Sequence, residues 1–76
     1  MKIYNIGIIG CGSIAAKMAA TLGGMKGVKR YAVASRTVEK AKAFAEKWQF
    51  AKAYGSYEEL ASDAEVDLIY IATPHA

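Results

Sequence analysis

The chain has 76 residues and a mass of 8.1 kDa, a length that allows one small domain at most. Hydrophobic residues make up 54% of it and charged residues 22%, a composition that excludes disordered and low-complexity chains. A single cysteine excludes an internal disulfide. The net charge of +3 comes from scattered basic residues, and no apolar stretch approaches the roughly 20 residues that span a bilayer. We therefore expect a cytoplasmic protein with neither a nucleic-acid nor a membrane partner.

The first third of the chain predicts a strand, a turn, a helix and a second strand. Residues 3–9 form a nearly continuous β-branched apolar run, which is typical of a strand buried on both faces. After the turn at 10–13, apolar residues follow at helical spacing as far as Leu22, and two glycines then end the predicted helix. The next apolar run, 28–35, predicts the second strand.

The rest of the chain repeats this alternation. Thr37 is a suitable N-cap for a second helix over 38–48, which has one apolar and one charged face. A short third strand is expected over 51–54. Residues 56–62 begin with a capping box, a serine followed three residues later by glutamate, and predict a short helix. A last apolar run, 66–72, predicts a fourth strand buried on both faces.

Alternating strands and helices predict a parallel sheet with helices on both of its faces. Right-handed crossovers restrict the topology, and the expected strand order is 3-2-1-4. This is the first half of a doubly wound, Rossmann-like α/β fold, with the strand at which the winding reverses direction. We therefore interpret residues 1–76 as the N-terminal part of one dinucleotide-binding domain, with its first four strands only.

The first candidate site is the turn Gly10-Cys11-Gly12-Ser13-Ile14-Ala15, which matches the pattern G-x-G-x-x-A. In dinucleotide-binding domains the first glycine permits the turn, the second lets a pyrophosphate approach the backbone, and the small last residue allows close packing of helix on strand. The helix N-terminus then offers N–H groups and a positive dipole end to the phosphates. The alternative is a glycine-rich turn that only allows tight packing.

The second candidate site is the end of the second strand, which reads Ser35-Arg36-Thr37 and holds no acidic residue. NAD-binding domains carry an acid near this point for the ribose hydroxyls, whereas an arginine can pair with the 2′-phosphate of NADP and stack on adenine. Ser35 and Thr37 would add hydroxyl donors. We therefore expect NADP in preference to NAD as the cofactor. The alternative for Arg36 is a solvated surface cation.

The third candidate site is Ala72-Thr73-Pro74-His75, at the carboxyl end of the fourth predicted strand. Ligands of open α/β sheets bind beyond the strand ends at the switch point, so this segment should face the glycine turn across a crevice. Thr73 and His75 are expected to contact the ribose or the nicotinamide end of the cofactor. A lone histidine is more often a surface or capping residue, and we assign it no catalytic role.

The remaining chemistry-bearing residues receive structural interpretations. Asp63, Glu65 and Asp67 resemble a metal-binding set in composition, but we interpret them as a solvated loop before the fourth strand. Cys11 is interpreted as a space-filling residue of the turn. The sequence has no Ser/His/Asp set and no zinc-ligand spacing. We therefore predict no catalytic residue and no metal site in this chain.

Three motifs in order make the chain resemble the N-terminal half of the nucleotide-binding domain of the glucose–fructose oxidoreductase and inositol dehydrogenase family (Gfo/Idh/MocA). The motifs lie at 8–15, 33–36 and 67–75, and the resemblance covers the whole chain. The pair Ser35-Arg36 resembles the NADP-using members, such as dihydrodiol dehydrogenase-like enzymes.

The resemblance implies hydride transfer between a nicotinamide and a carbon atom of a sugar, a polyol or a diol. It also implies a following Glu-Lys-Pro motif, whose lysine binds substrate, and a second, substrate-binding domain, neither of which is in this sequence. We therefore expect the chain alone to be inactive, with exposed apolar faces and an open outer edge on its fourth strand. Such an edge, or the second domain, would support a homo-oligomer.

Two other functions stay open at this point. One is a free-standing half-domain that binds a nucleotide or a protein partner without catalysis. The other is a methyltransferase, a class that also places a glycine-rich loop after its first strand. Methyltransferases usually carry an acid at the end of the second strand for a ribose, and Ser35-Arg36 departs from that pattern.

Overall fold

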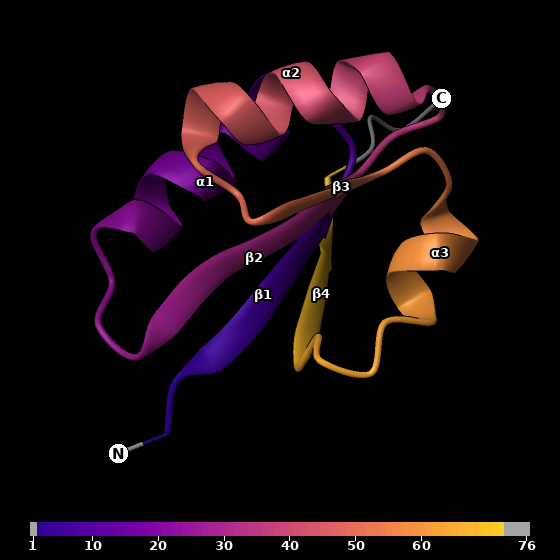
Figure 1. Ribbon diagram of the computed structural model, residues 1–76. Coiled ribbons are helices and arrows are strands. Elements are labelled where there is room, and N and C mark those ends of the chain that lie inside the picture. Colours follow the sequence, from indigo (N-terminus) through magenta and orange to yellow (C-terminus); the bar gives the residue numbers. More distant parts are fainter. Residues whose placement is uncertain (1, 73–76) are drawn as a thin grey trace.

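The structure is a computed structural model that describes residues 2–72 (Figure 1). Every strand and helix expected from the sequence is present, with bounds that differ by at most two residues from the expected ones. The elements in chain order are β1 (Tyr4–Ile9), α1 (Ser13–Gly23), β2 (Val28–Ala34), α2 (Val38–Trp48), β3 (Lys52–Tyr54), α3 (Tyr57–Ala61) and β4 (Leu68–Ile71).

The four strands form one sheet in the order β3-β2-β1-β4, and all neighbouring strands are parallel. This confirms the predicted strand order and the Rossmann-like α/β fold. Helices α1 and α2 cover one face of the sheet, and α3 lies on the other (Figure 1). The chain therefore winds one way from β1 to β3, and the α3 crossover carries it back to β4 on the far side of β1.

The alternation of side chains along the strands builds a separate core on each face of the sheet. Ile6, Ile8 and Val33 are fully buried beneath α1 and α2. On the other face Leu60 of α3 is fully buried against the strands. Gly7 allows this approach, because a Cβ atom there would lie only 3.1 Å from a Leu60 methyl carbon. The glycine in β1 therefore serves the packing of α3 on the sheet.

The burial of β4 differs from the expectation. Its four residues were predicted to be buried on both faces, but all of them are exposed, from 38% for Ile69 to 71% for Ile71. The reason is that, among residues 2–72, β4 pairs with β1 on one side only and no helix covers its faces fully. The prediction of exposed apolar faces and an open outer edge is confirmed for the described residues.

None of the helices in this part of the chain has the length and apolar character needed to cross a membrane.

Candidate dinucleotide-binding site

The turn between β1 and α1 requires a glycine at its first position. Gly10 has a φ of +115°, a conformation that side chains disfavour, and its N–H donates to the carbonyl of Ala34 at 2.9 Å. That bond ties the turn to the end of β2. At the other end of the motif, Ala15 of α1 is fully buried in the core, as expected of a small residue that lets the helix pack closely on the sheet. These two positions are therefore explained by the fold itself.

Gly12 is different, because nothing in residues 2–72 explains a glycine there. Its φ of −84° and ψ of −167° suit any residue, and an added Cβ atom would meet no atom within 4 Å. Gly12 is the N-cap of α1, no side chain caps this helix end, and its first turn holds no acidic residue. The N-terminal end of α1 therefore has no side-chain cap among the described residues, and its N-cap residue carries no side chain. This arrangement fits a phosphate group, which an N-terminal helix end binds through its N–H groups and dipole.

The end of β2 lies at the same edge of the sheet as the glycine turn. Ser35 is only 7% exposed, and its N–H donates to the carbonyl of Tyr54 at 3.1 Å. Thr37 is the N-cap of α2, as predicted, and its hydroxyl oxygen accepts a hydrogen bond from the N–H of Lys40 at 3.4 Å. Arg36, between them, is exposed. The guanidinium group is therefore available to a ligand at this edge, while the Thr37 hydroxyl is already used by the helix.

A cavity of about 510 Å³ opens between the start of α1 and α2. Its lining includes Gly12 and Ser13 from the turn and Lys40 from the first turn of α2. Lys40 was not predicted from the sequence, because its place beside the glycine turn depends on how α1 and α2 pack. A larger cavity of about 630 Å³ lies elsewhere, lined by residues such as Lys29 and Gln49. It includes the start of β2, whereas ligands of such sheets bind at the carboxyl ends of the strands, so the smaller cavity is the candidate site.

Cys11 is half-buried within the glycine turn. Burial raises the pKa of its thiol, although a hydrogen bond with Ser35 and the charge of Lys40 act in the opposite direction. The thiol is therefore protonated at neutral pH and is a weak nucleophile. This agrees with a space-filling role in the turn.

The end of β4 lies beside the glycine turn. Ala72 is 2% exposed, and its N–H donates to the carbonyl of Ile9 at 2.8 Å, one residue before Gly10. The structure thus brings Ala72, the first residue of the third candidate segment, beside the glycine turn at the carboxyl edge of the sheet. Thr73, Pro74 and His75 lie outside the described residues.

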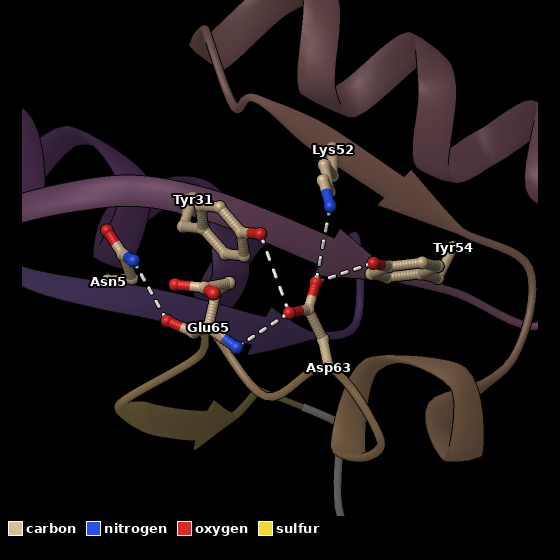
Figure 2. Close-up of polar contacts among 6 residues, drawn as sticks. All are labelled: Asn5, Tyr31, Lys52, Tyr54, Asp63 and Glu65. Atoms are coloured by element: carbon tan, nitrogen blue, oxygen red, sulfur yellow. Dashed lines mark hydrogen bonds and ion pairs between the residues drawn. The ribbon is translucent and has the colours of Figure 1, made fainter.

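The interpretation of residues 63–67 as a solvated loop is wrong for Asp63. Its side chain is 7% exposed and lies against β2 and β3 (Figure 2). One carboxylate oxygen accepts from the Tyr54 hydroxyl at 2.6 Å and lies 3.7 Å from Nζ of Lys52. The other accepts from the N–H of Glu65 at 2.9 Å and from the Tyr31 hydroxyl at 3.5 Å. Within residues 2–72, no group of acids, histidines and cysteines has an arrangement that could hold a metal ion.

These contacts predict a pH dependence of stability. The hydrogen bond from Tyr54, followed by that from Glu65, holds the pKa of Asp63 below its usual value. The folded state therefore favours the ionised carboxylate, and its contribution is complete above the unfolded pKa of about 3.9. As the pH falls from there through the lower folded pKa, this contribution is lost. Urea denaturation should show Asp63→Asn less stable than the wild type at pH 7, with the difference shrinking below about pH 4. A difference independent of pH would contradict the assignment.

The fold and the turn define the class of the protein as a dinucleotide-binding Rossmann domain. The family model described as "Oxidoreductase family, NAD-binding Rossmann fold" (GFO_IDH_MocA) matches residues 4–76, and the chain belongs to this family. This confirms the family expected from the three motifs.

Similar proteins of known sequence or structure agree with this family. The chain is 44% identical over 71 residues to trans-1,2-dihydrobenzene-1,2-diol dehydrogenase of Mus musculus, covering 91% of the chain and 21% of that enzyme. A 3-ketoreductase from Actinomadura kijaniata, solved with NADP and TDP-benzene, is 28% identical with a TM-score of 0.89, over 96% of this chain and 22% of that one. Levoglucosan dehydrogenase with NADH has a TM-score of 0.92 at 21% identity, over 96% and 22% of the two chains, and shows the fold alone. The chain thus spans about a fifth of the length of these relatives.

Proposed function

We propose that this chain is the N-terminal cofactor-binding part of an NADP(H)-dependent oxidoreductase. The observation that carries the proposal is the start of α1, where no side chain of the described residues caps the helix and an added Gly12 Cβ atom would meet nothing within 4 Å. Phosphate binding at that position accounts for a glycine that the fold itself does not need. The absence of an acid at Ser35-Arg36-Thr37, together with the exposed Arg36, favours NADP over NAD.

The cofactor would extend along the carboxyl edge of the sheet. Its pyrophosphate would lie over the turn, its adenosine 2′-phosphate beside the end of β2, and its nicotinamide half beyond the end of β4. When bound, the nicotinamide supplies the hydride chemistry, and the residues of this chain hold and orient it. The proposed binding residues are Gly10, Gly12, Ser13, Ile14, Ala15, Ser35, Arg36, Thr37, Ala72, Thr73, Pro74 and His75.

The reaction of the intact protein is proposed from its relatives. These relatives include a trans-1,2-dihydrobenzene-1,2-diol dehydrogenase and a 3-ketoreductase, which supports a substrate with a hydroxyl or carbonyl carbon, such as a sugar, polyol or diol. The chain holds no catalytic residue in this proposal, and we expect it to be inactive by itself. A homo-oligomer would use the outer edge of β4 or the second domain, and the intact protein would be cytoplasmic.

Titration of the purified chain with NADPH, NADH and S-adenosylmethionine tests the proposal. We expect NADPH to bind most tightly, as followed by the change in its fluorescence. Tighter binding of NADH would overturn the cofactor preference. If only S-adenosylmethionine bound, the proposed oxidoreductase function would be wrong. Oxidation or reduction of a substrate by the chain itself would contradict the expected inactivity.

Lys40 is expected to strengthen the binding of a phosphate-bearing cofactor. It shares the cavity of Gly12 and Ser13 and adds a positive charge there. Lys40→Ala should weaken NADPH binding about fivefold, the effect of losing one exposed charge-assisted contact. Lys42 is the matched control, because it lies on the same helix and lines a different cavity, with Glu46. Equal effects of the two substitutions would show that only the overall charge matters.

A further inference from the structure

Two groups of contacts fix the loop between α3 and β4. At its start, the Asp63 carboxylate is held by side chains of β2 and β3 (Figure 2). At its end, the amide nitrogen of the Asn5 side chain donates to the carbonyl of Glu65 at 2.9 Å, and the Asn5 backbone N–H donates to an Asp67 carboxylate oxygen at 2.8 Å. The N–H of Asp67 returns a bond to the Asn5 carbonyl at 2.8 Å. The loop therefore joins β4 to all three other strands.

The register of β4 on β1 needs such an external constraint. Leu68 pairs with Ile6 and Ile71 with Ile9, and the four residues of β4 are all large, apolar and partly exposed. Strand register is set strongly where one face is buried and its pattern distinguishes inside from outside. In β4 both faces carry apolar residues, so a shift by one residue would still place apolar side chains on each face. The side-chain pattern of β4 therefore specifies its register on β1 only weakly. The loop contacts supply the missing constraint.

We propose that Asp63 is a positioning residue for the cofactor, acting through the register of β4. By holding the α3–β4 loop, its carboxylate determines which residue of β4 reaches the glycine turn, and so places Ala72 beside Ile9 and Gly10. Asp63 itself is held by side chains of β2 and β3 and bonds to none of the proposed cofactor-binding residues that the structure describes. This inference rests on the proposed function, in which the nicotinamide half of NADP lies beyond the end of β4.

The test uses two ligands that depend differently on β4. NADPH reaches both the end of β2 and the end of β4, whereas adenosine 2′,5′-bisphosphate represents only the half bound at β2 and the turn. Asp63→Asn keeps the size of the side chain and removes its charge. Glu65→Gln is the matched control, because Glu65 is exposed and bonds to Asp63 and Asn5 through its backbone alone.

Hydrogen exchange supplies a readout that does not need the cofactor. The N–H of Ala72 bonds to Ile9 and reports on the pairing of β4 with β1, while the N–H of Gly10 bonds to Ala34 and reports on β1 and β2. For Asp63→Asn we expect about tenfold weaker NADPH binding, unchanged binding of adenosine 2′,5′-bisphosphate, and about tenfold faster exchange at Ala72 than in the wild type. Exchange at Gly10 should rise by clearly less than exchange at Ala72, and all properties of Glu65→Gln should remain as in the wild type.

Results that differ from these expectations either overturn the role of Asp63 or show that the proposed function itself fails. Equal weakening of both ligands, with equally faster exchange at both amides, would show that Asp63 only stabilises the fold. Unchanged NADPH binding would also overturn it. If Asp63→Asn does not fold, Tyr54→Phe, which removes one bond to the carboxylate, should give the same selective pattern more weakly. If the wild type binds neither ligand, the proposed function fails, while exchange at Ala72 still decides whether Asp63 fixes the register.

Discussion

Replacement of Gly12 by alanine is expected to weaken NADPH binding about 30-fold, equivalent to ~2 kcal/mol, while the chain stays folded. The added methyl group at the N-cap of α1 would meet no atom of the described residues within 4 Å, so it would occupy space that the proposed phosphate needs. Because the backbone angles of Gly12 suit alanine, urea denaturation should place the stability within about 1 kcal/mol of the wild type. Fluorescence titration with NADPH measures the loss of affinity.

Gly24 provides the matched control for this substitution. It caps the other end of the same helix, and a Cβ atom there would make only an ordinary contact of 3.7 Å with the Thr21 carbonyl. Gly24→Ala should therefore bind NADPH as the wild type does. If Gly12→Ala also bound NADPH normally, the open space at the start of α1 would have no part in phosphate binding, and the main support for the proposed function would be lost.

The sequence was sufficient to predict the elements and their order because the signals involved are local. Apolar runs, helical spacing, the cap at Thr37 and the capping box at Ser56 all lie within a few residues, and the structure contains each of them. The strand order then followed from the handedness of crossovers, which brings the ends of β1, β2 and β4 to one edge. The edge of the sheet that holds the candidate site could therefore be predicted from the sequence. Which residues bind the cofactor there is still a prediction.

What the sequence did not predict depends on packing between distant segments. Asp63 is 32 residues from Tyr31, and nothing local distinguishes a buried carboxylate from an acid in a solvated loop. Lys40 lines the cavity of Gly12 only because α2 packs beside the start of α1. The apolar run of β4 predicted burial, but burial is set by what covers a strand, and composition alone carries no information about that.

The proposed preference for NADP predicts a second large effect, at Ser35. An aspartate at this position would resemble the acid of NAD-binding domains, accept the ribose hydroxyls of NADH, and repel the 2′-phosphate of NADPH. Two like charges about 4 Å apart near a protein surface repel by up to about 4 kcal/mol, so NADPH binding should weaken by about 100-fold. NADH binding should strengthen, and the preference between the two cofactors should reverse. Parallel fluorescence titrations of Ser35→Asp with both cofactors measure this.

Two further variants test whether the changed cofactor preference comes from the position of the new carboxylate and not from added charge or altered folding. Ser62→Asp adds the same charge at the end of α3, away from the end of β2, and should leave the preference unchanged. Arg36→Ala removes the exposed guanidinium, so it should weaken NADPH binding and leave NADH binding as it is. Urea denaturation of Ser35→Asp checks that a carboxylate is tolerated at a position that is 7% exposed. A folded Ser35→Asp with unchanged NADPH affinity would mean that the 2′-phosphate lies elsewhere, and the end of β2 would then not determine the choice of cofactor.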